Sequence, residues 1–98
     1  MAEKTVMEKK TRIIVKRPPL YKVVLLNDDY TTMEFVVAVL MRIFHKSASE
    51  ATQIMLDVHQ KGKGIVGLYP LDIARAKVLQ VEQMAGQAGF PLMASIEE

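Results

Sequence analysis

An amide and two carboxylates stand together at Asn27-Asp28-Asp29, and they are the side chains best suited to chemistry. They directly follow Tyr21–Leu26, a stretch rich in β-branched and aromatic residues that predicts a strand. A helix start is predicted just after them, so we expect an acidic loop held at both ends by regular structure. Composition alone favours a purely structural role, in which these residues simply form the turn, because Asn and Asp dominate turns for local reasons.

His59 is the second candidate for chemistry. It follows Met55 by four residues on a predicted helix, so both side chains project from one flank of that helix, beside its core stripe. A lone histidine in such a place is usually structural. The chain has no HExxH motif and no nucleophile elbow with a Ser-His-Asp order. Hydrolysis by a metal held between Asp28, Asp29 and His59 has too few ligands, so we expect no enzyme, no metal and no cofactor.

The bulk composition bounds the class of protein. A chain of 98 residues supports one hydrophobic core, and 50% hydrophobic with 24% charged residues is ordinary for a folded domain. The absence of cysteine excludes disulfides and thiolate nucleophiles. No apolar stretch approaches the roughly 20 residues of a membrane span, and no export signal is recognisable. The positive net charge of +2 comes from the first seventeen residues, because beyond them the charges nearly balance. We expect a cytoplasmic monomer that binds neither membranes nor nucleic acid.

Two parts of the chain differ in composition. Residues 1–18 are charged and end in Pro18-Pro19, which blocks helix and favours an extended chain, so we interpret them as a flexible tail before a core of residues 19–98. Within the core, two Ser/Thr-to-Glu pairs have the spacing of capping boxes and predict two helix starts: Thr31 with Glu34, and Ser47 with Glu50.

The remaining helices and strands are predicted from the periodicity of the apolar residues and from the positions of glycine and proline. The first helix is expected from about Thr32 to Phe44, and it is apolar on nearly every side, which implies burial on more than one side or a face kept for a ligand. The second helix is expected to end at Gly62. A strand is predicted at Lys63–Tyr69.

Pro70 opens a third helix that runs to Gly86 or Gly89, and a half-buried strand starts at Phe90. The order β-α-α-β-α-β predicts an α+β fold of two layers, in which three helices cover one side of a three-stranded sheet. The order of the strands in the sheet does not follow from these patterns.

Three segments together resemble the ClpS adaptor family. The sequence of residues 21–36, YKVVLLNDDYTTMEFV, is similar to the family's signature, and residues 51–63, ATQIMLDVHQKGK, are similar to its second block. The similarity continues through ARAKV at residues 74–78 to Pro91-Leu92, and it covers the chain from about Pro19 to Glu97. Thr32 departs from the pattern, because many members of the family have proline there.

The resemblance implies a non-enzymatic adaptor. Such a protein binds substrates whose first residue is Leu, Phe, Tyr or Trp and delivers them to the ClpA unfoldase and the ClpP protease. By resemblance, Asn27, Asp28, Asp29 and His59 bind the α-amino group of that first residue. Still by resemblance, its side chain enters an apolar pocket lined by Leu26, Thr31, Met33, Val36, Met55, Val58 and Leu92.

The same resemblance implies how the adaptor meets its unfoldase. Asp72 and Lys77 match family positions that contact the unfoldase's N-terminal domain, although isolated charges on a helix are more often a solvated face. The N-terminal tail matches the family's extension, which is needed for handover. The alternative is a non-catalytic docking module that binds a different partner peptide, and the acidic loop paired with His59 is the feature that argues against it.

Overall fold

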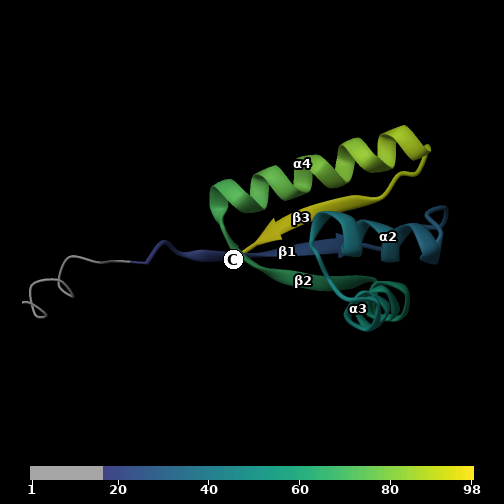
Figure 1. Cartoon of the computed structure of the whole chain (residues 1–98), viewed down its shortest axis with the longest axis horizontal. Coiled ribbons are helices and arrows are strands. Elements are labelled where there is room, and N and C mark those ends of the chain that lie inside the picture. The colour runs from purple at the N-terminus through teal and green to yellow at the C-terminus, as the bar shows by residue number, and fades with distance from the viewer. Residues whose placement is uncertain (1–16) are drawn as a thin grey trace, which may run out of the picture.

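The computed structural model of the protein describes residues 17–98. The elements follow one another as β1 (Leu20–Leu26), α2 (Met33–Ile43), α3 (Ala48–Lys61), β2 (Lys63–Pro70), α4 (Leu71–Ala88) and β3 (Met93–Glu97) (Figure 1). The predicted α+β class and the order β-α-α-β-α-β are therefore confirmed. The tail predicted at residues 1–18 lies outside the described residues, except for the exposed Arg17 and Pro18.

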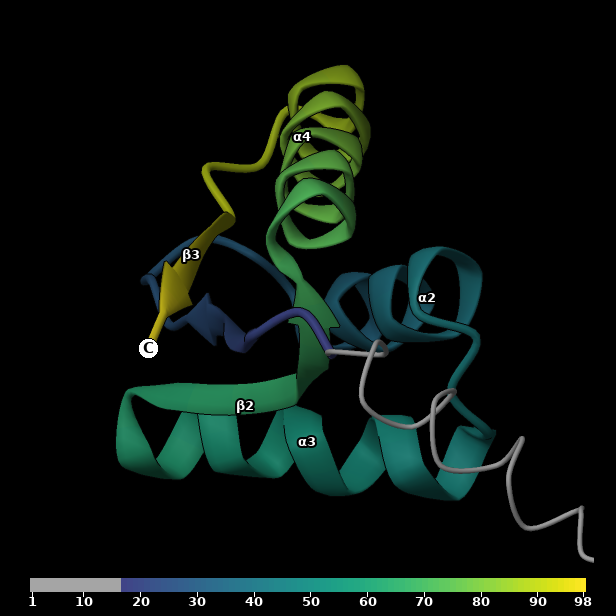
Figure 2. The same cartoon turned by 90° about the vertical axis from the view of Figure 1, so that its left-hand side faces the viewer.

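The sheet is antiparallel and has the order β2-β1-β3, so the first strand is the central one. At one end of β1, Leu26 lies opposite both Lys63 of β2 and Met93 of β3. Seen along the sheet, α2 lies between α4 and α3, and the three helices leave the opposite side of β1 and β3 uncovered (Figure 2). The expected two layers are thus a sheet and one group of helices.

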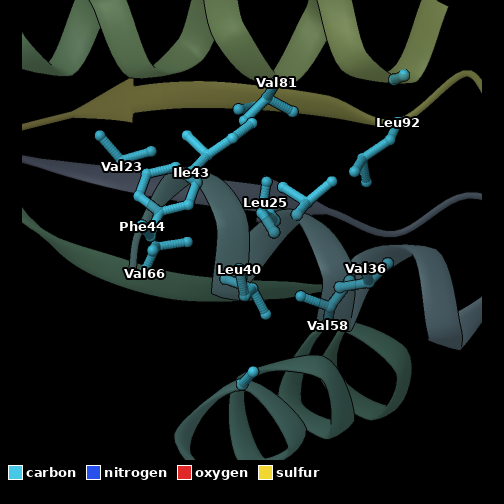
Figure 3. Close-up of a cluster of buried hydrophobic side chains, with 14 of the residues drawn as sticks. Val23, Leu25, Val36, Leu40, Ile43, Phe44, Val58, Val66, Val81 and Leu92 are labelled. Atoms are coloured by element: carbon cyan, nitrogen blue, oxygen red, sulfur yellow. The ribbon is translucent and has the colours of Figure 1, made fainter. Parts of the chain in front are cut away.

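The core fills the space between β1 and the helices (Figure 3). Val23 and Leu25 of β1 are fully buried there, because alternate residues of a strand point to the same face. The unusually apolar α2 packs against both α3 and α4, and it buries Leu40 and Ile43. Burial on more than one side therefore accounts for much of the apolar character of this helix.

The second predicted capping box is confirmed. The Ser47 hydroxyl accepts a hydrogen bond from the Glu50 amide at 3.1 Å, and the Glu50 carboxylate accepts one from the Ser47 amide at 3.1 Å. Helix α3 ends at Gly62, as expected, with a φ of 91° that a side chain would oppose. Helix α4 similarly ends at Gly89, with a φ of 81°.

The first predicted capping box, between Thr31 and Glu34, is wrong. Helix α2 is capped by Thr32, whose hydroxyl accepts a hydrogen bond from the Phe35 amide at 3.1 Å. The reason is that Asp28 binds both the amide and the hydroxyl of Thr31, each at 2.7 Å. Thr31 therefore belongs to the preceding turn, and the helix begins one residue later than a Thr31 cap would require.

The last strand begins later than predicted, at Met93 and not at Phe90. The Phe90 amide is used by the end of α4, where it donates to the Ala85 carbonyl at 2.9 Å. Pro91 has no amide to donate to a sheet. The Phe90 ring packs instead on Phe35, with 4.8 Å between ring centroids.

Candidate functional site

The register of the sheet brings the acidic loop to the end of α3. Because Leu26 pairs with Lys63, the next residue, Asn27, lies beside Gly62, and its amide donates to the Gly62 carbonyl at 2.9 Å. Gly62 ends α3, and His59 is in the last turn of that helix. Two segments more than 30 residues apart in the sequence thus present Asn27 and His59 at one end of the sheet.

A close approach between β2 and α3 holds this arrangement. A Cβ atom at Gly64 would lie 2.8 Å from Val58 Cγ2 and 3.0 Å from the Ile54 carbonyl oxygen. Both distances are shorter than ordinary contacts between these atoms. Only glycine lets the strand lie at this distance from the helix turn that carries His59.

Asp28 organises the loop itself. One carboxylate oxygen accepts hydrogen bonds from the Tyr30 and Thr31 amides, at 2.8 and 2.7 Å, and the other accepts one from the Thr31 hydroxyl at 2.7 Å. Partial burial raises the pKa of Asp28, but these hydrogen bonds from Thr31 and Tyr30 together outweigh it and hold the pKa below its ordinary value. Asp28 is therefore ionised at neutral pH and already occupied by the loop.

An open hollow of about 510 Å³ lies where the loop, the start of α2 and the end of α3 meet. Its lining includes six of the residues predicted from the sequence: Asn27, Asp28, Asp29, Thr31, Met33 and His59. The side chains of Asn27, Asp29 and His59 are exposed. Within residues 17–98 no hydrogen bond or ion pair occupies these three side chains, so they are available to a ligand.

Two further residues line the same hollow, Thr32 and Glu34 in the first turn of α2. The sequence interpretation missed them because it assigned Glu34 to a capping box with Thr31. The signal was present, since Glu34 follows the acidic loop by only five residues. With Glu34, three carboxylates face the hollow, and His59 is the single basic side chain that lines it. The site therefore has a negative field that favours a cation.

The apolar candidates are distributed differently. Val36, Val58 and Leu92 are 5%, 2% and 3% exposed and belong to the packed core (Figure 3). Met55 is half-buried against that core. Met33 is the first residue of α2, is 42% exposed, and lines the hollow.

Leu26 is the pocket candidate that the structure supports least. It is half-buried and follows Leu25, a core residue, so strand alternation directs it to the opposite face of the sheet. Thr31, by contrast, is half-buried, is held by Asp28 and lines the hollow directly.

The two candidates for unfoldase contact lie on α4, and neither lines the hollow. Asp72 is exposed in the first turn of the helix. Lys77 is half-buried, and its ammonium donates to the Ile43 carbonyl at 2.6 Å and lies 5.8 Å from the Phe44 ring centroid. Lys77 thus satisfies a carbonyl that the end of α2 leaves without a helical partner, so it is more than a solvated charge.

Among residues 17–98, no three His, Asp or Glu side chains are grouped as metal ligands would be. No helix in that part of the chain is long and apolar enough to cross a membrane.

Residues 16–95 match the family model described as ATP-dependent Clp protease adaptor protein ClpS. A relative from Acetivibrio thermocellus, the ATP-dependent Clp protease adapter protein ClpS, is 59% identical over 97 residues, which cover 99% of this chain and 98% of the relative. The protein of the same description from Wolinella succinogenes is 55% identical and covers 93% of this chain and 89% of its own.

A solved structure has the same fold. Agrobacterium tumefaciens ClpS2 bound to L-phenylalaninamide superposes with a TM-score of 0.79 at 43% sequence identity. The match covers 83% of this chain and 98% of that one.

Proposed function

Because the chain belongs to the ClpS family of ATP-dependent Clp protease adaptors, we propose that it binds the first residue of substrate proteins that begin with Leu, Phe, Tyr or Trp. The bound substrate is then delivered to a ClpA-type unfoldase and its ClpP protease. The protein acts by binding alone and catalyses no step itself. Its place of action is the cytoplasm.

The hollow beside His59 is the observation that carries this proposal. A free α-amino group has a pKa near 7.7 to 8.0, so at neutral pH it is mostly a cation with three N–H donors. Asn27 supplies an amide oxygen and His59 a ring nitrogen, which accepts a hydrogen bond in the neutral state of the imidazole. Asp29 supplies a carboxylate that the loop leaves exposed. These acceptors and the negative field suit an α-ammonium group.

Asp28 has a different part in the proposed site. One of its carboxylate oxygens already accepts hydrogen bonds from the Tyr30 and Thr31 amides, and the other accepts one from the Thr31 hydroxyl. It therefore acts by holding the loop and by its charge. Asp29 is the carboxylate that approaches the ammonium group, directly or through water.

The side chain of the bound residue enters beside Met33, toward the region where Val36, Val58 and Leu92 pack. Flexible thioethers accommodate several apolar shapes, so Met33 and the half-buried Met55 can adjust to aliphatic and aromatic guests. Met33 at the rim opposes a branch at Cβ, which excludes Ile and Val. Burial of such a side chain contributes about 1.5 to 3 kcal/mol, and each charge-assisted hydrogen bond adds about 1.5 to 3 kcal/mol.

The structural neighbour supports this mode of binding. Phenylalaninamide, the ligand named for that protein, combines a free α-amino group with an apolar aromatic side chain. These are the two chemical groups that the hollow and its Met33 rim suit here. After the cost of association, we expect affinities near 1 μM, which corresponds to about −8.2 kcal/mol.

Delivery is the second half of the proposal, and family membership supports it. The exposed Asp72 on α4 is available to an unfoldase domain, and Lys77 contributes through the donors that its bond to Ile43 leaves free. The tail preceding β1 engages the unfoldase during handover.

Peptides that differ only in their first residue test the binding step. Fluorescence anisotropy should show micromolar binding of peptides that begin with Leu or Phe, and no binding of those that begin with Ile or acetyl-Leu. Asp29→Asn and His59→Ala should each weaken binding about tenfold or more. Asp57 is a carboxylate on α3 that pairs with Lys61 at 3.4 Å. The Asp57→Asn variant is the matched control and should leave binding unchanged.

Equal binding of all four peptides, or of none, would contradict the proposal. The chain would then be better described as a docking module for a different peptide. Binding of acetyl-Leu alone would show that the apolar pocket exists without the amine anchor, and it would refute the roles of Asn27, Asp29 and His59.

A further inference from the structure

A second hollow, of about 440 Å³, lies between the end of α2 and the middle of α4. It is separated from the first hollow by the length of α2, because the first lies at Met33 and the second at Ile43. Eleven helical residues span about 16 Å. A ligand in one hollow therefore leaves the other accessible.

The lining of this second hollow is basic. Arg42 and His45 come from the end of α2 and the residues after it, and Lys77 comes from α4, while no carboxylate lines it. Lys77 is held in place by its 2.6 Å hydrogen bond to the Ile43 carbonyl and its position over Phe44. A fixed ammonium group in a basic hollow is prepared for an anion without further loss of side-chain freedom.

The backbone of His45 supports a role for its side chain. Its φ of 56° makes it the one non-glycine residue with a positive φ within residues 17–98. Glycine would adopt this conformation without strain, as Gly62 and Gly89 do at the ends of the other two helices. Such residues cluster at functional sites, and here the strained position places an imidazole in the basic hollow.

Uncharged amides extend the hollow along α4. Gln80, Gln83 and Gln87 line it at helical spacing, so the row of amides is about 10 Å long. Three residues of an extended peptide span a similar length, at about 3.3 Å each. A side-chain amide both donates and accepts, which matches the groups of a peptide backbone.

From this combination we propose that the second hollow binds an acidic segment of a partner protein in extended form. Arg42 forms a two-point contact with a carboxylate of the segment, and His45 and Lys77 contact the same or a neighbouring carboxylate. The glutamines bond its backbone. The inference does not depend on the amine site, because the residues that line the two hollows are different. It shares Lys77 with the proposed contact to the unfoldase.

A titration with acidic peptides tests the inference. The probe is acetyl-Glu-Glu-Glu-Glu-amide, whose blocked amine keeps it out of the first hollow, and its control is the peptide with four glutamines. We expect the glutamate peptide to shift the backbone NMR resonances of His45 and Gln83 and the glutamine peptide to leave them in place. Arg42→Gln should weaken this binding about tenfold, and Arg75→Gln, an exposed charge on α4 outside the hollow, should not.

His45→Gly separates binding from structure. Since glycine relieves the backbone strain, this variant should have an unchanged or higher melting temperature and yet bind the glutamate peptide more weakly. Arg42→Gln and His45→Gly should both bind a peptide beginning with Leu as the wild type does. This result distinguishes the inference from the proposed binding of the α-amino group.

Three results would overturn the inference. The first is equal shifts with the glutamate and glutamine peptides. The second is equal weakening by Arg42→Gln and Arg75→Gln. The third is saturation by inorganic phosphate that the glutamate peptide does not displace, which would make the hollow a phosphate site.

Discussion

Replacing Gly64 by alanine tests how the candidate site is held together. The new Cβ atom would lie 2.8 Å from Val58 Cγ2 and 3.0 Å from the Ile54 carbonyl oxygen. Carbon atoms in contact normally lie about 3.5 to 4.0 Å apart. The Ile54 oxygen belongs to the helix backbone and cannot rotate away, so β2 and α3 must separate.

Two effects of opposite sign decide how much Gly64→Ala changes the free energy of unfolding. Gly64 does not have a positive φ, so alanine is conformationally allowed and should stabilise the fold by about 0.4 to 1 kcal/mol through the unfolded state. Overpacking of a core typically destabilises by about 1 to 3 kcal/mol. Because the contact involves backbone, we expect the second effect to win and the free energy of unfolding to fall by about 1 to 2 kcal/mol.

Urea unfolding provides the measurement, and Gly86→Ala provides the matched control. A Cβ atom at Gly86 meets nothing within 4 Å, and the residue lies inside α4. The control should therefore be more stable than the wild type by about 0.5 to 1 kcal/mol. Gly64→Ala should also weaken binding of a peptide that begins with Leu, because separation of β2 from α3 moves His59 away from Asn27.

The opposite result would refute this reasoning. If Gly64→Ala is as stable as Gly86→Ala, β2 and α3 adjust without strain, and the close approach does not hold the site. If Gly64→Ala unfolds more easily but binds the peptide normally, the close approach stabilises the fold without positioning His59.

Three other predictions concern single side chains. Asp28→Asn should be less stable than the wild type at pH 7, and the difference should shrink as the pH falls below 3.8, because the lowered pKa of Asp28 stabilises the fold only while the carboxylate is ionised; a difference in unfolding free energy that is independent of pH would contradict this. Thr32→Ala should lower the free energy of unfolding by about 1 kcal/mol through loss of the cap on the Phe35 amide, whereas Thr32→Ser should not, and equal effects of the two in urea unfolding would refute the cap. Lys77→Met keeps the aliphatic chain but removes the donor to Ile43, and it should lower the melting temperature by about 4 to 8 °C for each kcal/mol lost; an unchanged melting temperature would show that this hydrogen bond is negligible.

Local patterns in the sequence were sufficient for the elements and their order. The Ser47 capping box and the helix end at Gly62 depend only on residues a few positions apart, so the sequence contains all that they need. The two misplaced starts, at Thr31 and at Phe90, also depend on short-range contacts. Asp28 binds Thr31 three residues away, and the Phe90 amide donates to the Ala85 carbonyl five residues away at the end of α4. Capping-box spacing and strand alternation do not include these competing hydrogen bonds, so they placed both starts too early.

For the functional residues, the sequence indicates which side chains matter, and the tertiary structure decides which of them meet. Asn27, Asp29 and His59 could be named from the sequence because their residue types and their family resemblance mark them. Their meeting in one hollow was decided by the pairing of β1 with β2, which joins segments about 30 residues apart and aligns Asn27 with Gly62. Of the three basic residues in the second hollow, Arg42, His45 and Lys77, only Lys77 lies in a segment that the family resemblance marks, and no motif joins the three. The second hollow exists because α4 packs beside the end of α2, and such side-chain proximity between distant segments is a property of the tertiary structure alone.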